Sequence, residues 1–387
     1  MTMAGFCSRK AFTRFPFAGS LLLIVALGAC TGGEARQTPE ESPNQPRWSV
    51  DEPGVRVGEG GGPGEALDRV YGGVLRPDGS MVIGNSGSSQ LHIYGPDGRL
   101  TASAGRHGAG PGEFGSINWI GVLPGDSIIA FDLRHQRFSV WSPGGTFVRM
   151  FNSQAPPGPV RPIGVFADGS ILIVREGGYD PRAGAGVVRD SMLALRMNPT
   201  GEVASMSRSV PGAEWLVYRH PTSFRATQLP FGRTGHVAVM GSHFVHGSSD
   251  AGTLAVYDPS GSQVRTIEVT APARTPSRAE ISAFLDELGD RTERSALARH
   301  YRNGAGGTAA VFTALRSDAE GNLWVRTAPD AGADSVTWLV LGPGGGRIGS
   351  VRMHAGWLPL DIRRNTLLLR ESNPDGVQTV SVRRIVR

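Results

Sequence analysis

Beyond the first 46 residues, the chain repeats an alternating apolar strand that ends in a Pro-x-Gly turn. In the first two copies, Leu91 and Ile93 correspond to Phe138 and Val140. Proline presets φ for the second position of a type I turn, and glycine suits the fourth. An alternating strand with such a turn predicts a β-hairpin. The turn occurs five times, at residues 96–98, 143–145, 199–201, 259–261 and 343–345.

A second kind of turn precedes another apolar strand in each unit. It occurs six times, at residues 77–79, 124–126, 168–169, 235–236, 320–322 and 364–365. If the strands of a unit are named a, b, c and d, this turn joins a to b, and Pro-x-Gly joins c to d. The sixth unit reaches a c strand at residues 377–386 and has no d strand after it.

The missing d strand is predicted near the other end of the chain, around residues 48–57. The segment that follows, 60–65, matches 108–113 at an offset of 48 residues, which is typical of the blade pitch in propellers. Pro53 is compatible with an edge strand, where proline is tolerated. The pattern therefore predicts an all-β, six-bladed β-propeller at residues 47–387, in which the N-terminal strand closes the last blade.

The linker Gly-Ala-Gly-Pro-Gly-Glu-Phe at residues 108–114 and the Asp-Gly-Ser turns at 78–80 and 168–170 carry a family resemblance. Together they resemble the hallmarks of NHL-type six-bladed β-propellers over roughly residues 50–387. The resemblance implies the fold. It does not imply one function, because that family contains binding scaffolds, lyases and lactonase-like hydrolases.

A segment at residues 272–307 interrupts the β pattern and predicts a short helical insertion. Ser277 and Glu280 form a capping-box pattern, and Ile281 and Leu285 follow at helical spacing. A second helix is predicted at about residues 291–301. The insertion is either a lid over the central channel or a decoration packed on the rim. Because it falls between two complete blades, we predict that it covers the channel mouth without completing the core.

The topology sorts the connections onto two faces. The a–b and c–d turns share one face and are short, whereas the b–c and d–a connections share the other. The second face is predicted to hold the long segments 177–189, 242–252, 272–307 and 328–335. Binding residues concentrate on long loops of a rigid scaffold, so we place function on this face.

Candidate ligand contacts are the polar residues predicted at the inner ends of the a strands. They are Asp68, Arg69, Asn118, Arg161 and Arg225, with Asp361 further along the last a strand. This set contains two carboxylates and one amide but three arginines. Because a calcium ion binds to oxygen ligands and is repelled by positive charge, the set argues against a calcium-type site and favours an anionic ligand. The alternative is that the arginines form salt bridges inside the ring. No P-loop, CxxC pair or G-x-S-x-G elbow occurs, so no catalytic residue or cofactor is predicted.

The histidines could in principle bind a metal. His243 and His246 are three residues apart, and His220 and His236 are assigned to the same blade. A spacing of three suits a helix better than a strand, and no glutamate joins the pair. They are therefore interpreted as polar loop histidines, and no metal is predicted.

The N-terminal segment has the pattern of an exported lipoprotein. Residues 1–29 read as a signal peptide with a positive start and a short apolar core, followed by a sequence that resembles the bacterial lipobox before Cys30. Cys30 is the predicted lipid attachment site, and residues 30–46 are a polar, flexible tether. Thr31 is not an aspartate, which favours the outer membrane if the host is Gram-negative.

Charge excludes one class of partner. Removing Arg9, Lys10 and Arg14 with the signal peptide reduces the net charge from +5 to +2, and the remaining arginines are scattered. Nucleic acid is therefore not a predicted partner.

The leading hypothesis is a noncatalytic, membrane-tethered module that presents a loop-rich face to a protein, peptide or glycan. The alternative is a lyase or hydrolase with its site in the channel under the insertion.

Overall fold

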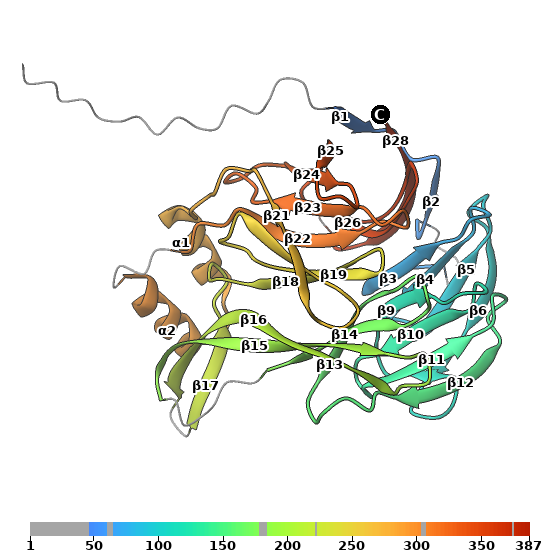
Figure 1. The fold of residues 1–387 in the computed structure, drawn as a ribbon, viewed down its shortest axis with the longest axis horizontal. Helices are drawn as coiled ribbons and strands as arrows, with labels where there is room; N and C mark the ends of the chain where they lie inside the picture. Colours follow the sequence, from blue (N-terminus) through green and yellow to red (C-terminus); the bar gives the residue numbers. More distant parts are fainter. Residues whose placement is uncertain (1–45, 60–64, 178–183, 221–222, 303–306, 374) are drawn as a thin grey trace, which may run out of the picture. The chain divides into compact units, whose positions relative to one another are not determined.

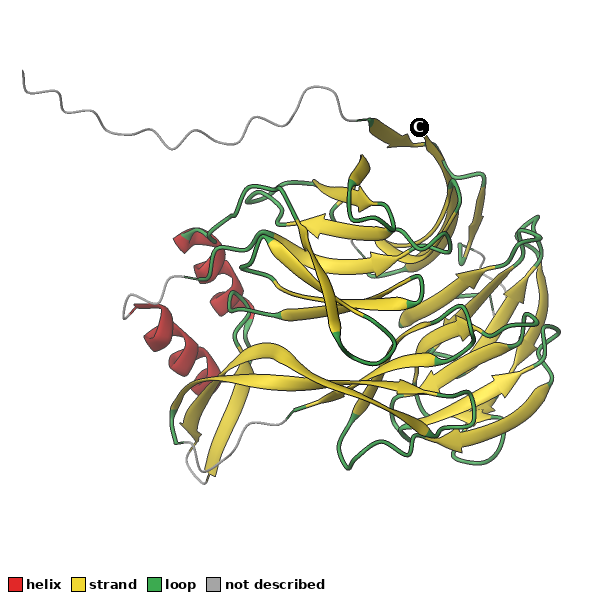
Figure 2. Ribbon diagram, viewed as in Figure 1, coloured by secondary structure: helices red, strands yellow, loops and turns green. Residues whose placement is uncertain are grey.

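The structure is a computed structural model, and it describes residues 46–59, 65–177, 184–220, 223–302, 307–373 and 375–387. The predicted signal peptide, Cys30 and nearly all of the tether lie outside the described residues, as do residues 60–64 of the repeated linker. The described chain consists mainly of antiparallel strands, with two helices (Figure 2). It forms a six-bladed β-propeller, which confirms the predicted fold class.

Three blades are four-stranded antiparallel sheets. Blade 1 contains β3 (Val70–Leu75), β4 (Met81–Asn85), β5 (Gln90–Tyr94) and β6 (Leu100–Ala104). Blade 2 contains β9 (Ile117–Val122), β10 (Ile128–Asp132), β11 (Arg137–Trp141) and β12 (Phe147–Asn152). Blade 4 contains β18 (Gly235–Met240), β19 (His243–Ser248), β20 (Thr253–Tyr257) and β21 (Gln263–Glu268). A two-residue parallel pair, β7 (Arg106–His107) and β8 (Glu113–Phe114), lies in the linker between blades 1 and 2.

Blade 3 has a fifth strand and a long outer hairpin. It contains β13 (Val160–Val165), β14 (Ile171–Glu176), β15 (Gly186–Met197), β16 (Val203–His220) and β17 (Ser223–Gln228). Helices α1 (Arg278–Glu287) and α2 (Arg291–Arg302) follow blade 4. Ser277 caps α1 in the predicted capping box with Glu280.

The last two blades are joined into one nine-stranded sheet by the N-terminal strands. Blade 5 contains β22 (Phe312–Ser317), β23 (Leu323–Thr327), β24 (Ser335–Leu341) and β25 (Arg347–His354). Blade 6 contains β26 (Leu358–Arg363), β27 (Thr366–Ser372) and β28 (Gln378–Val386), completed by β1 (Arg47–Val50) and β2 (Val55–Val57). The prediction that the N-terminal strand closes the last blade is confirmed.

The closure differs in one respect from the expected single strand. The segment around Pro53 interrupts the pairing, so that β1 and β2 each pair with β28. In addition, Trp48 of β1 pairs in parallel with Val351 of β25 in blade 5. The N-terminal segment thus attaches to both neighbouring blades, and Figure 1 shows β1 beside the end of β28.

The core lies between neighbouring blades. Between blades 1 and 2, for example, Val82 and Ile93 pack in one buried cluster with Ile117 and Ile128. Alternating strands therefore bury both of their faces, one against each adjacent blade. The inner strands β3 and β9 come so close that a Cβ atom on Gly72 would lie 2.8 Å from a backbone nitrogen of β9.

The predicted strand assignment in the fourth unit was wrong. Residues 235–236 do not form an a–b turn, because β18 begins at Gly235 and is itself the inner strand of blade 4. The predicted long segment 242–252 contains strand β19, and His243 and His246 are strand residues. The segment taken as the a strand is β17, the added edge strand of blade 3. His220 and His236 consequently belong to different blades.

Candidate functional site

The inner strands of the blades enclose a central channel. It has a volume of about 750 Å³ and is lined by the inner strands of all six blades, β3, β9, β13, β18, β22 and β26. These strands run in the same direction around the channel, so their first residues lie at the b–c and d–a face. A cavity of this volume can hold a small-molecule ligand.

Two arginines and a histidine line one side of the channel. Arg161, His236 and Arg316 come from β13, β18 and β22, which are the inner strands of consecutive blades. Burial lowers the pKa of His236 to about 4, with further contributions from the charges of Arg161 and His246. Burial and the charge of Arg161 also lower the pKa of Arg316. At neutral pH the imidazole is therefore uncharged, and the two guanidinium groups supply the positive charge of this side.

A carboxylic acid lies in the wall where blades 6 and 1 meet. Asp361 of β26 accepts hydrogen bonds from the backbone N–H groups of Leu75 (2.8 Å) and Ile362 (2.9 Å). Burial raises its pKa, although those hydrogen bonds and the nearby Arg363 act in the opposite direction. Because the bond to Leu75 joins the last blade to the first, Asp361 has a structural role in the ring.

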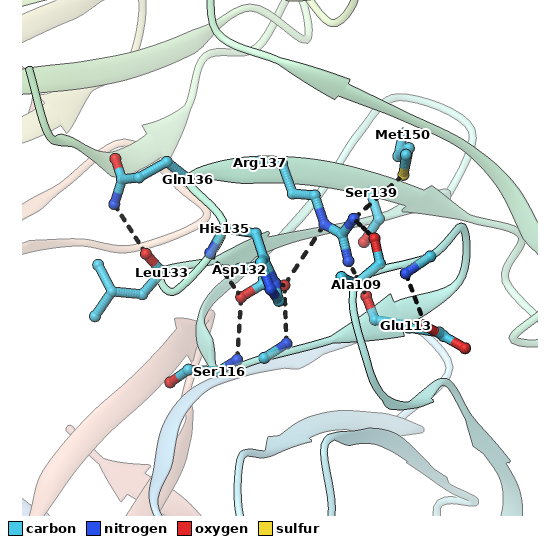
Figure 3. Close-up of polar contacts among 12 residues, drawn as sticks. Ala109, Glu113, Ser116, Asp132, Leu133, His135, Gln136, Arg137, Ser139 and Met150 are labelled. Atoms are coloured by element: carbon cyan, nitrogen blue, oxygen red, sulfur yellow. Dashed lines mark hydrogen bonds and ion pairs between the residues drawn. The ribbon is translucent and has the colours of Figure 1, made fainter.

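The linker at residues 108–114 is held by a buried polar cluster in blade 2, shown in Figure 3. Asp132 accepts hydrogen bonds from the N–H groups of Gly115 (2.9 Å) and Ser116 (3.0 Å), and its Oδ2 lies 2.7 Å from Nδ1 of His135. Arg137 donates to the carbonyl oxygen of Glu113 at 2.7 Å. Burial acts to raise the pKa of Asp132, but the hydrogen bonds from Gly115, His135 and Ser116 outweigh it and lower the pKa. This cluster fixes the linker to the blade.

Blade 1 holds its linker in a similar way. The Asn85 side chain accepts a hydrogen bond from the N–H of Asp68 (3.1 Å) and donates to the carbonyl of Ala66 (2.8 Å). The Asp68 carboxylate forms an exposed ion pair with Arg69 at 3.1 Å. Neither residue is among those that line the channel. These two candidates thus lie on the linker that precedes β3.

The structure separates the other three candidate residues. Arg161 lines the channel and pairs with Glu176 at 3.2 Å. Asn118 is half-buried on β9 and is not among the lining residues. Placing Arg225 at an inner strand end was wrong: it lies on β17, and Nη1 is 3.6 Å from Asp290 at the start of α2. The error follows from the misassigned fourth unit, because an additional edge strand has the same alternating pattern as an inner strand.

The helical insertion does not cover the channel, so the predicted lid is also wrong. Helices α1 and α2 pack against the outer hairpin of blade 3, where Leu297 of α2 is buried in a cluster with Leu216, Tyr218 and Leu229. No residue of the described helices lines the channel. Figure 1 shows α2 beside β16 and β17, with α1 next to α2. The apolar stripe of the insertion pairs with a hairpin that the sequence pattern did not reveal.

We name this side structure the annex: residues 186–191 of β15, residues 212–220 of β16, β17, and helices α1 and α2. Strand β14 pairs only with residues 192–197 of β15, so the remainder of the hairpin projects beyond the blade. The projection lies at the b–c and d–a ends of the strands. The annex therefore enlarges the face on which function was predicted.

Arg316 and His236 are the site residues that sequence reasoning missed. Arg316 lies late in its strand, not at the end where candidates were sought, and His236 was assigned to a turn. An arginine in an otherwise uncharged inner strand, Phe-Thr-Ala-Leu-Arg-Ser, was the available signal. Within the described ranges, no group of three or more His, Cys, Asp or Glu residues is arranged to hold a metal ion. Neither of the two described helices is long and apolar enough to cross a membrane.

Comparison with known proteins supports the fold alone. No family model and no curated protein sequence matches this chain. A member of the DUF4221 family from Bacteroides vulgatus is similar in structure, with 13% sequence identity, a TM-score of 0.51, and coverage of 88% of this chain and 99% of that chain. The RRP9 WD40 repeats match with 10% identity, a TM-score of 0.45 and coverage of 87% and 99%. Virginiamycin B lyase from Staphylococcus aureus matches with 10% identity, a TM-score of 0.41 and coverage of 82% and 94%.

Proposed function

We propose that this protein is a membrane-tethered, extracytoplasmic binding module of the cell envelope that presents its annex-bearing face to a protein, peptide or glycan. The observation that carries this proposal is the position of the added structure. The long hairpin of blade 3 and the helical insertion come from separate parts of the chain, yet they pack together and enlarge the same face. Binding surfaces commonly arise where segments are added to a rigid scaffold.

The annex exposes an aromatic side chain next to an arginine. Phe224 on β17 is 38% exposed, and the guanidinium of Arg219 lies 5.8 Å from the centre of its ring. Aromatic residues and arginines are enriched at protein interfaces. The alternative is an enzyme with its site in the channel beneath the insertion. This alternative required the insertion to cover the channel, but the insertion packs beside blade 3.

Membrane tethering rests on the sequence pattern around Cys30, and assignment to the NHL type rests on the linker at residues 108–114. A lipid anchor and a polar tether would place the propeller at the membrane surface while leaving its loop-rich face accessible. If the host is Gram-negative, the outer membrane is the expected location.

Site-directed photocrosslinking tests the binding face. A photoreactive residue placed at Phe224 should yield adducts of discrete mass in native envelopes, because this position faces the proposed partner. The matched control carries the same probe at Asp97, an exposed residue in a c–d turn on the opposite face. Adducts from both positions alike, or from Asp97 only, would contradict the proposed face.

Fractionation tests the tether separately. The Cys30→Ser variant should move from the membrane to the soluble fraction, because it lacks the thiol to which lipid is attached. The unchanged protein serves as the control. If the variant stays as membrane-bound as the unchanged protein, the anchor assignment is wrong, whatever the crosslinking shows.

A further inference from the structure

Three side chains from consecutive inner strands form a positive side of the central channel. Strand β18 lies between β13 and β22, and it contributes His236 between Arg161 and Arg316. Arg161 influences the pKa of both other residues, which places its charge close to each of them. The arrangement combines residues that are up to 155 positions apart in the sequence.

Arg316 has no acidic partner. Its side chain is solvent-exposed and lines the channel enclosed by the ring of blades. Within the part of the chain that the structure describes, it forms neither a hydrogen bond nor an ion pair. Its position next to a second arginine adds repulsion. Two like charges that face the same channel repel each other, so this arrangement favours the binding of an anion between them.

The other charged groups do not provide that counter-charge. Glu176 pairs with Arg161 at 3.2 Å, but both side chains are about half exposed, at 46% and 50%, and such a pair is weak. Asp318 accepts hydrogen bonds from Asn322 and Trp324 within the a–b turn of blade 5. Asp361 is bound by backbone N–H groups. This side of the channel therefore offers two guanidinium groups to an incoming anion, whereas Arg363, a third lining arginine, lies near Asp361.

We propose that Arg316 and Arg161, with His236 between them, bind the oxyanion group of a small carboxylate or phosphate ligand inside the central channel. A planar guanidinium matches both groups through paired N–H donors. The uncharged imidazole adds a neutral donor or acceptor. This site is separate from the annex face, so either proposal can fail without the other.

The test uses the whole mature protein, with inorganic phosphate and acetate as separate probes and sodium chloride at matched ionic strength as the control. Thermal melting and the imidazole NMR signals of His236 are recorded during each titration. Phosphate or acetate should raise the melting temperature with saturation, and the pKa of His236 should rise from about 4 because a nearby anion favours its charged form. The probe with the larger effect identifies the type of oxyanion.

Variants separate a binding role from a structural one. Arg316→Gln should melt higher than the unchanged protein without added anion, since it removes an unpaired charge, and should bind the probe about tenfold more weakly or worse. Arg161→Gln should weaken binding in the same way. Arg99→Gln, at an exposed position in a c–d turn, should behave like the unchanged protein. If neither probe binds with saturation, or if Arg316→Gln melts lower and still binds as the unchanged protein does, the proposal is refuted.

Discussion

Trp48 provides a quantitative test of how the ring is closed. Its side chain is 7% exposed, and its ring centre lies 6.5 Å from that of Trp324 in blade 5. The guanidinium of Arg387 lies 4.6 Å from the same ring. Replacing a buried tryptophan with alanine lowers the free energy of unfolding by about 3–5 kcal/mol. For a body of roughly 340 residues, the entropy of unfolding is about 0.7 kcal/mol per kelvin, so Trp48→Ala should lower the melting temperature by about 4–7 °C.

Truncation extends the same test to the whole closing segment. A protein that begins at Gly58 lacks β1 and β2, loses buried Trp48 and Val57, and exposes the edge of β28. The buried side chains alone contribute about 5–8 kcal/mol, a large share of the 5–15 kcal/mol typical of total stability. We therefore expect loss of cooperative melting, or aggregation through the open edge.

Differential scanning calorimetry of two truncated proteins tests whether β1 and β2 stabilise the ring, by comparing their melting temperatures. The protein that begins at Pro46 keeps both strands and serves as the control. Val148→Ala, at a residue 55% exposed on β12, controls for loss of apolar side chain without loss of core, and its melting temperature should change little. If the protein that begins at Gly58 melts like the one that begins at Pro46, the closure contributes no stability and the reasoning is refuted.

Four further predictions concern stability. The pKa of His236 is about 4 in the folded protein and 6.5 in the unfolded chain, so the free energy of unfolding should decrease by about 3 kcal/mol as pH falls from 6.5 to 4. Urea unfolding at pH 7 and pH 4 measures this decrease, and the His236→Gln variant should lack it. The pKa of Asp361 is raised in the folded protein, so its contribution to the free energy of unfolding decreases as pH rises from 3.8 to the pKa of the folded state. In urea unfolding over this pH range, the Asp361→Asn variant should show a smaller decrease. Asp132→Ala should cost about 3–5 kcal/mol in urea unfolding at pH 7, because it leaves buried donors without their acceptor, and a cost under about 1 kcal/mol would contradict the role of the cluster. Replacing residues 276–303 with a short Gly/Ser bridge should leave β-type circular dichroism but expose the apolar hairpin to a hydrophobic dye; global unfolding would show that the insertion is part of the core.

The repeat pattern determined the architecture. Alternating apolar residues bury both faces of each strand between neighbouring blades, and the two kinds of turn mark where strands reverse. Both features are local, so they could be counted along the chain. The missing d strand after the sixth unit pointed correctly to residues 48–57, because an unpaired edge must be completed by some other strand. The helices were likewise predictable, since a capping box and an apolar stripe are contained within one short segment.

Only the tertiary structure decided where those elements pack and which polar residues meet. Strand β17 has the alternation of an inner strand, and its place at the edge of blade 3 depends on its pairing with β16. The partner of the helical stripe is a hairpin about 80 residues earlier in the chain, so no local pattern could distinguish a lid from the annex. Arg161, His236 and Arg316 are brought together by the curvature of the ring. Periodicity along a strand reports how residues alternate between its two faces, whereas the closeness of side chains from different blades depends on the closed circle.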